Sequence, residues 1–217
     1  ETLPTLHLPA LRLLLALTGG GNLDVQDELL RTLDDPKICP NEICATNFRR
    51  LLRNSITDLK MQRKASKADG AYSKEAGFAL EVLQILRNLT LGDHMGMQVY
   101  LQRQPGHPRE LDLISDVVLY LNQIERDIKE AVANTDQIGV TLPGDGAMMD
   151  RTFAAFRVLI SMCTGPNPDN QVAVALTDII SVINRILFYC DYHFSDLQDC
   201  VTTDRRSKAY YSESEAR

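Results

Sequence analysis

The amino-acid sequence predicts an all-α fold, and two patterns along the chain support that prediction. Hydrophobic residues recur at helical spacing almost everywhere, and no alternation of apolar and polar residues lasts long enough to require a strand. The helical stretches are short, are separated by glycine and proline, and are each too small to bury an apolar face alone. Because stacking of neighbouring helix pairs buries such faces, the expected architecture is an armadillo-like helical solenoid.

Glycine, proline and capping residues divide the chain into its expected helices. Pro4 and Pro9 permit an extended start before the first helix, and the glycine run that ends at Gly21 stops it, since glycine adopts positive φ at little cost. Asn22 is a suitable N-cap for the second helix. The expected helices span Leu6–Leu17, Leu23–Leu33, Ile43–Ala65, Lys74–Leu91, Met95–Gln104, Glu110–Ala133, Met148–Cys163 and Val172–Tyr189.

The apolar stripes of these helices predict the core. With 44% hydrophobic residues the chain has enough apolar side chains for one. The residues expected to be buried are Leu13, Leu17, Phe48, Leu52, Leu83, Leu86, Leu121, Phe156, Leu159, Ile183 and Leu187.

Changes in composition predict the domain organisation. Ser66 to Ser73 is rich in small and charged residues and contains Gly70, which is typical of a flexible linker. We therefore expect solenoid helices over 1–66, a linker over 67–73, an armadillo-like domain over 74–195 and a polar tail over 196–217. The linker and the tail are expected to be the most mobile segments and the first cut in limited proteolysis.

Charge and apolar runs argue against several classes of partner. The formal net charge of −6 comes from mixed charges without a basic stripe, so no nucleic-acid partner is expected. The longest apolar run, Leu11 to Leu17, is far below the roughly 20 residues of a membrane-spanning helix. Because the chain opens at Glu1 without a signal-peptide pattern, we expect it to be a piece of a longer protein.

The cysteines and basic residues have ordinary structural interpretations. Five irregularly spaced cysteines favour reduced thiols, and Cys163 and Cys190 are expected in the core. The expected helix at Ile43–Ala65 has a cationic face, which is predicted to be solvated surface, with docking to acidic lipid or a neighbouring domain as the alternative. That face carries Arg49, Arg50, Arg53, Lys60 and Arg63.

Neither an enzyme nor a metal-site motif is found in the sequence. It lacks the signature of a phosphate-binding loop, of a nucleophile elbow, of a zinc protease or of a dinucleotide-binding turn. Cys39 and Cys44 flank a proline turn, but without a second ligand pair a zinc site is a minor alternative. No catalytic residue and no cofactor are therefore expected. The four histidines, which lack partners at metal-ligand spacing, are His7, His94, His107 and His193.

Three turns carry more specific motifs. The first is Gly20-Gly21-Asn22-Leu23-Asp24-Val25-Gln26, and the last is Gly165-Pro166-Asn167-Pro168-Asp169-Asn170-Gln171. Between them, Leu89-Thr90-Leu91-Gly92 leads to Gln98-Val99-Tyr100-Leu101. The first and last each have a local interpretation as a helix C-cap followed by an N-cap, and the likeness of 13–30 to 85–101 is weak evidence for a repeat.

In their order and spacing these motifs resemble the region around the RIH-associated domain of inositol trisphosphate receptors and ryanodine receptors. The resemblance implies that 74–195 is the RIH-associated domain and that the fold is armadillo-like. It also implies a cytosolic module of an intracellular calcium-release channel, on the endoplasmic or sarcoplasmic reticulum, that relays regulatory signals toward the pore. The implied partners are the other domains and subunits of a homotetramer, and membrane contact is implied only through a pore region outside this chain.

The resemblance also locates a departure from the family pattern. In this family the region supplies two glutamates to an activating calcium site, and the corresponding positions here are Leu91 and Ser161. Calcium takes six to eight oxygen ligands, many of them carboxylate, whereas leucine offers none and serine one neutral oxygen. No metal ligand is therefore expected at either position, although Asp93 would restore one ligand if the register were shifted.

Two other functions stay open from the sequence. A soluble armadillo-like scaffold that binds peptide or protein partners has the same helical pattern. Six apolar spans after Arg217 would favour the channel, and their absence would favour the scaffold. An enzyme with an unfamiliar helical site needs clustered titratable groups, for which the sequence offers no candidate set.

Overall fold

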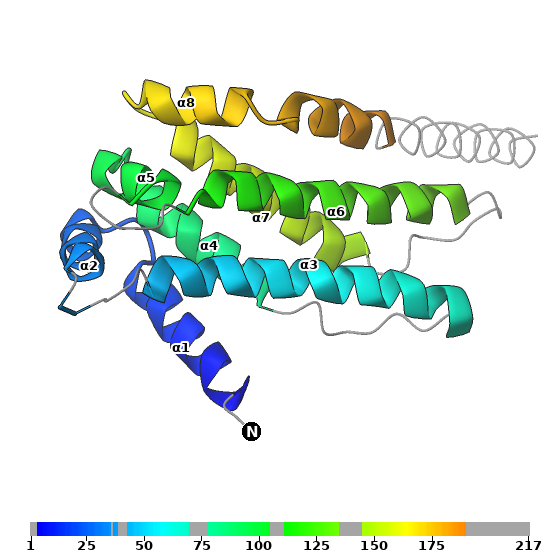
Figure 1. Cartoon of the computed structure of the whole chain (residues 1–217), viewed down its shortest axis with the longest axis horizontal. Helices are drawn as coiled ribbons and strands as arrows, with labels where there is room; N and C mark the ends of the chain where they lie inside the picture. The colour runs from blue at the N-terminus through cyan, green and yellow to red at the C-terminus, as the bar shows by residue number, and fades with distance from the viewer. Residues whose placement is uncertain are drawn as a thin grey trace, which may run out of the picture.

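The computed structural model describes residues 4–35, 37–38, 43–69, 78–104, 111–134 and 145–189, and all of the regular structure in these ranges is helical (Figure 1). The all-α prediction is therefore confirmed. The helices are α1 (Pro4–Leu17), α2 (Leu23–Asp34), α3 (Ile43–Asp69), α4 (Ala79–Thr90), α5 (Met95–Gln102), α6 (Leu113–Asn134), α7 (Asp145–Cys163), α8 (Pro168–Ala175) and the segment Ile179–Tyr189, which is bent by 63° from α8.

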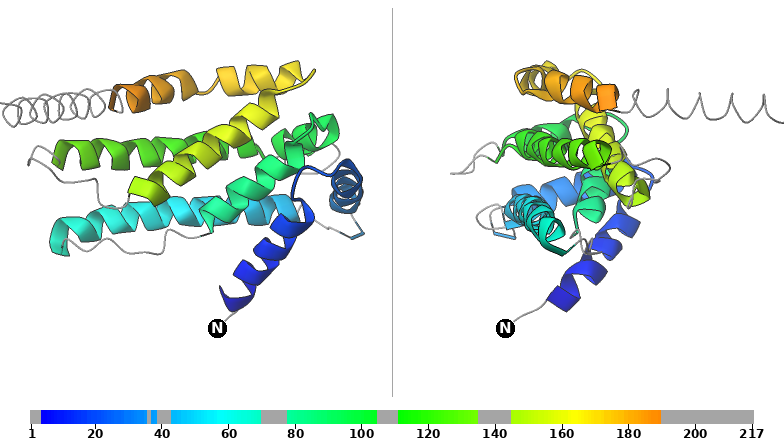
Figure 2. Two further views of the ribbon diagram at one scale, coloured as in Figure 1. Left: turned by 180° about the vertical axis from the view of Figure 1, so that it is seen from behind. Right: turned by 90° about the vertical axis from the view of Figure 1, so that its right-hand side faces the viewer.

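These helices form three consecutive triplets that stack on one another. The first helices of the triplets pack in the order α1, α4, α7, and the second helices in the order α2, α5, α8. Of the third helices, α3 packs on α6 (Figures 1 and 2). Arg185 of Ile179–Tyr189 forms an ion pair with Glu125 of α6 at 3.2 Å. Stacked triplets of short helices are an armadillo-like solenoid, as the sequence predicts.

The same turn joins the first and second helix of every triplet. A glycine with positive φ stands in each turn, with φ of 78° at Gly20, 74° at Gly92 and 79° at Gly165. Glycine takes this conformation without the steric cost of a Cβ atom. A capping side chain follows the glycine and accepts a hydrogen bond from a backbone N–H of the next helix. Asn22 accepts from Val25 at 3.2 Å, His94 from Met97 at 3.1 Å and Asn167 from Asn170 at 3.3 Å.

Buried glutamines tie the first and second turns to the triplet that follows each of them. The Gln26 amide of α2 donates to the Asn88 carbonyl at 2.7 Å and to the Leu91 carbonyl at 3.0 Å, at the end of α4. Gln98 of α5 repeats this arrangement at the end of α7, where its amide donates at 2.9 Å to the carbonyls of Ser161 and Thr164. Both glutamines are fully buried. Each donates to carbonyls at a helix end, which have no backbone partner within their own helix.

The predicted core is mostly confirmed, and its errors lie in the first and last triplets. Phe48, Leu52, Leu83, Leu86, Leu121 and Leu159 are buried, and Phe156 and Ile183 are half-buried against them. Leu13, Leu17 and Leu187 are 62%, 53% and 56% exposed, so their predicted burial is wrong. The physical reason is that the first and last layers of a stack have a neighbouring layer on one side only.

The helix boundaries differ from the prediction at several helix ends. α1 begins at Pro4 and contains Pro9, and α3 continues to Asp69, so 66–69 is helical rather than linker. Residues 70–73 and the tail beyond 189 lie outside the described ranges. The expected helix Val172–Tyr189 begins earlier, at Pro168, and breaks after Ala175, where the Thr177 hydroxyl accepts from the Ile179 amide at 3.3 Å.

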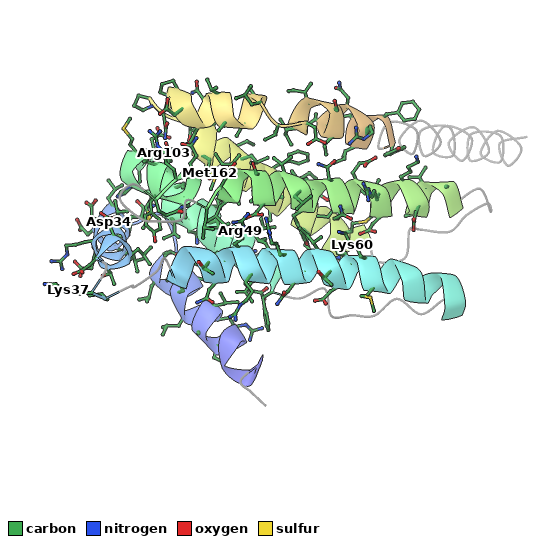
Figure 3. The ribbon with its side chains drawn as sticks, viewed as in Figure 1. Asp34, Lys37, Arg49, Lys60, Arg103 and Met162 are labelled. Carbon is green, nitrogen blue, oxygen red and sulfur yellow. The ribbon has the colours of Figure 1, made fainter. Side chains whose placement is uncertain are left out.

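The cationic face of α3 is partly paired rather than solvated. Arg49 and Arg53 lie 2.9 and 3.0 Å from the carboxylate of Asp116 on α6, as Figure 3 shows for Arg49 between the two helices. Arg50 and Lys60 on the same helix are exposed. Only 3% of the Asp116 side chain is exposed, and burial raises the pKa of its carboxyl by more than the two arginines lower it. The solvated interpretation is therefore wrong for Arg49, whereas Arg53 is paired but still 52% exposed.

We expect removal of the two arginines to cost more stability than removal of the carboxylate. Changing Arg49→Ala and Arg53→Ala together leaves a buried charge without a partner and is expected to lower the free energy of unfolding by about 3 kcal/mol. Asp116→Asn keeps the volume and leaves two arginines that can reach water, so we expect a loss of about 1 kcal/mol. Urea denaturation of the three proteins measures the difference, and equal losses would contradict it.

The buried carboxyl of Asp116 predicts that the stability of the chain depends on pH. Since its folded-state pKa is raised, the native state binds more protons than the unfolded state between the two pKa values. This group therefore makes the free energy of unfolding fall as the pH rises through that interval. Asp116→Asn should remove that contribution, which is measured by urea denaturation of both proteins at a series of acidic pH values.

The turn glutamines give a further stability prediction. Gln98→Met keeps the side-chain length but removes the glutamine donor from the Thr164 carbonyl and leaves the Ser161 carbonyl with the Thr164 hydroxyl alone. We expect the free energy of unfolding to fall by about 2 kcal/mol. Gln171 is the matched control, since it is exposed and binds a single carbonyl, that of Cys163, at 3.0 Å. A loss from Gln171→Met as large as that from Gln98→Met in thermal unfolding would be the contrary result.

Candidate functional site

The structure brings together Leu91 and Ser161, the two positions that the resemblance matches to the family's calcium ligands. Leu91 follows the last residue of α4, Ser161 lies in the last turn of α7, and both line one hollow of about 280 Å³. The other residues that line it are Arg87, Gly92, Asp93, Arg157, Ile160 and Thr164. This hollow is the candidate site.

Leu91 is held by its backbone and by the first turn. Its carbonyl accepts from Gln26, and its extended conformation ends α4. A Cβ atom placed on Gly21 would lie 2.5 Å from the Cβ atom of Leu91, so the first turn rests directly on this residue. The third turn rests on the same segment, since a Cβ atom on Gly165 would lie 2.8 Å from that of Asp93.

The side chain of Ser161 is already used between two helices. Its hydroxyl lies 2.7 Å from the hydroxyl of Thr90 on α4 and donates to the Val158 carbonyl at 2.9 Å. Ser161 is 5% exposed and Thr90 is fully buried. The hydroxyl therefore joins α4 to α7, and little of it is open to the hollow.

The electrostatics of the hollow are unfavourable for a divalent cation. Arg87 from α4 and Arg157 from α7 bring two positive charges to its wall, and Asp93 brings one carboxylate. Within the described ranges no group of three or more histidine, cysteine, aspartate or glutamate side chains is placed to hold a metal ion. A calcium ion here would face two guanidinium groups with one acidic ligand, which is poor coordination.

A second hollow of about 460 Å³ adjoins the first. It also contains Arg87 and Arg157, and the two hollows together are here called the α4–α7 groove. Its remaining lining residues are Leu15, Leu80, Gln84, Asn88, Asp150, Phe153 and Ala154. The sequence did not predict this groove, because the pairing of α4 with α7 joins segments far apart in the chain.

The histidines and cysteines that the sequence offered as candidates either have structural roles or lie outside the described residues. His94 caps α5, and its Nε2 atom lies 3.0 Å from an oxygen of Asp27 on α2. Cys163 is half-buried rather than in the core, and burial raises the pKa of its thiol. The side chains outside the described part are His7, Cys39, Cys44, His107, Cys190 and His193.

None of the described helices is by itself long and apolar enough to cross a membrane. Taken together, α8 and Ile179–Tyr189 have the length and composition of a membrane span, but the pair is bent by 63°.

Comparison with known proteins identifies the family. The family model described as RyR and IP3R Homology associated matches residues 73–187, which is more than half of the 217 residues. The chain belongs to the RyR and IP3R Homology associated family. No curated protein matches it. The resemblance stated from the turn motifs is thereby confirmed, and the RyR and IP3R Homology associated region extends from the segment before α4 into the helix Ile179–Tyr189, across the second and third triplets.

The contact between the first turn and Leu91 gives a prediction with an internal control. Gly20→Ala meets no atom within 4 Å and bears only the cost of positive φ, about 1–2 kcal/mol. Gly21→Ala bears that cost and also overlaps Leu91, which is expected to bring the loss of stability to about 3 kcal/mol or more. Thermal unfolding measures both. Adding Leu91→Gly should recover part of the Gly21→Ala loss and none of the Gly20→Ala loss.

Proposed function

We propose that this chain is a non-catalytic regulatory module of an intracellular ligand-gated calcium-release channel. It lies on the cytosolic face of the endoplasmic or sarcoplasmic reticulum membrane, outside the pore, and relays signals toward it. Membership of the RyR and IP3R Homology associated family supports this role. Its partners are the other domains and subunits of the same homotetrameric channel.

The observation that carries the proposal is the interlocking of the three turns. Gln26 and Gln98 bind the helix ends of the following triplet, and the turn segments rest on one another at Gly21 and Gly165. A stack joined in this way moves its layers together, because displacement of one turn breaks buried hydrogen bonds to the next. This is the mechanical property that a relay between two ends of a solenoid requires.

The calcium chemistry of the proposed module differs from the family pattern. Leu91 and Ser161 lack carboxylates, Ser161 is committed to Thr90, and two arginines line the hollow. We therefore propose that the module transmits regulatory signals without supplying calcium ligands at these positions. Calcium activation of the intact channel through this site is expected to be weak or absent.

Single-channel recording of the full-length channel tests this proposal. Leu91→Glu with Ser161→Glu places two carboxylates at the hollow, and we expect the pair to create or strengthen calcium dependence of the open probability. Either change alone should do less. Because Ser161 is buried, thermal unfolding of each variant must first show that the fold is retained.

The matched control adds two carboxylates elsewhere on the module. Leu176 and Ile180 are 82% and 62% exposed on the outer layer, so Leu176→Glu with Ile180→Glu makes the same change of charge away from the hollow. This control should leave the calcium dependence unchanged. Strong micromolar activation of the unmodified channel that Asp93→Ala abolishes would overturn the proposal, since it would show that calcium binds here through a shifted register.

A soluble scaffold that binds peptide partners is the second candidate function, and the α4–α7 groove favours it. The full-length sequence separates the two. Six apolar spans after Arg217 support the channel module, and a full-length protein without them supports the scaffold.

A further inference from the structure

Gln171 in the third turn stands where the first two turns have the glutamines that join the triplets. Gln26, Gln98 and Gln171 each lie six residues after the positive-φ glycine of their turn. Gln26 and Gln98 are buried and donate to the end of the first helix of the following triplet. Gln171 is exposed, and its amide donates at 3.0 Å to the Cys163 carbonyl at the end of its own helix α7. The third turn therefore carries the donor of a joint that the three described triplets leave unmade.

Two residues of α7 show which side of the third triplet lacks cover. Phe156 and Cys163 lie at the same distances before the turn glycine as Leu83 and Thr90 in α4. Leu83 and Thr90 are fully buried, and the Thr90 hydroxyl contacts α7, so these positions face the following triplet. Phe156 and Cys163 are only half-buried. The side of α7 that corresponds to the covered side of α4 is therefore partly open.

The first helix, α1, is open on its opposite side. Leu13 and Leu17 are 62% and 53% exposed, whereas the residues at the same distances before the turn glycine in α4, Ile85 and Leu89, are 0% and 1% exposed. Ile85 and Leu89 are covered because α4 packs between α1 and α7. The exposed leucines of α1 thus occupy positions that are buried wherever a triplet has a neighbour on both sides.

The end of α1 also holds the acceptors of the same joint. Gln26 and Gln98 bind the carbonyls that stand four residues and one residue before the turn glycine. In the first turn these are the carbonyls of Ala16 and Gly19. Within the described ranges neither carbonyl accepts from a glutamine side chain. One end of the chain therefore has the donor, and the other end has the acceptors.

We propose that two copies of this chain associate head to tail, with α1 of one copy stacked on α7 of the other. Gln171 then donates to the carbonyls at the end of α1, as Gln26 and Gln98 do within the chain. The same contact brings Leu13 and Leu17 against the side of α7 that holds Phe156, which buries apolar surface of both copies. A second copy is the occupant because this joint continues an interface that the chain already makes twice.

The chemistry of the two ends favours this arrangement over a symmetric dimer. A symmetric contact through the third triplet would bring two Gln171 donors together, and one through α1 would bring two sets of carbonyls together. Only the head-to-tail contact matches donors with acceptors. Such a contact either closes into a ring or continues from copy to copy. The inference goes beyond the proposed channel role, because it requires neither calcium nor a pore.

A disulfide between copies tests the register of the joint. The hydroxyl oxygens of Thr90 and Ser161 lie 2.7 Å apart between α4 and α7, and their counterparts in the proposed joint are Cys163 and Ala16. We therefore expect Ala16→Cys to link to Cys163 of a second copy on oxidation, since side chains this close suit disulfide geometry. A non-reducing gel detects the dimer, and mass spectrometry of the linked peptides identifies the bond. Leu119→Cys is the control, because this exposed residue lies in the second triplet and should not link to Cys163.

Sedimentation velocity at rising protein concentration tests the association itself. Leu13→Glu with Leu17→Glu blocks the α1 end. Cys163→Glu with Gln171→Glu blocks the third triplet, because the new carboxylates meet the negative end of α1. We expect each double variant alone to weaken self-association at least tenfold, about 1.4 kcal/mol. An equimolar mixture of the two should recover association but stop at two chains, since each pair retains one intact joint.

The control adds two carboxylates to the second triplet, which has neighbouring triplets on both sides. Met95 and Leu119 are 44% and 41% exposed there, so Met95→Glu with Leu119→Glu should leave the association constant within about twofold of the wild type. Thermal unfolding of every variant shows whether it is folded.

Three results would overturn the proposal. These are a wild-type chain that stays monomeric up to about 0.5 mM, a mixture of folded blocked variants that stays monomeric, and oxidation of Ala16→Cys without a bond to Cys163. The first result would leave the two ends to partners other than a second copy. None of the three bears on the calcium dependence of the channel, so the two proposals fail separately.

Discussion

The hydrogen bonds from Gln26 and Gln98 to the carbonyls at the ends of α4 and α7 are the joints on which the solenoid depends. Every α-helix leaves its last carbonyls without partners, and burying them without donors is costly. Here the donor comes from the neighbouring triplet rather than from the same helix. The carbonyls of Asn88, Leu91 and Thr164 therefore receive these donors only when successive triplets stack in register.

The turn glycines also help to keep the triplets in register, because they allow neighbouring turns to come into close contact. Gly21 and Gly165 lie against Leu91 and Asp93 at distances that a Cβ atom could not tolerate. Positive φ lets each turn reverse tightly enough for its capping residue to start the next helix. Ion pairs then link the outer layers, from α3 to α6 through Asp116 and from the last helix to α6 through Glu125.

The candidate site follows from this stacking. Because the second and third turns are adjacent, Leu91 and Ser161 meet at one hollow although they are distant in the chain. Two arginines, Arg87 and Arg157, and two aspartates, Asp93 and Asp150, line this hollow and its neighbour. The site therefore lacks the excess of carboxylates that a calcium ion needs.

The sequence by itself determined the all-α fold, the positions of the turns, the family and the absence of carboxylates at Leu91 and Ser161. These depend on local features, such as helical periodicity, glycine at positive φ and the capping role of Asn22 and Asn167, which are properties of neighbouring residues. Only the tertiary structure decided which apolar stripes are covered, because Leu13 and Leu187 have ordinary helical spacing but lie on layers with one neighbour. It also decided that Asp116 pairs with Arg49 and that Arg87 and Arg157 share a groove, since contacts between helices distant in sequence have no local signal.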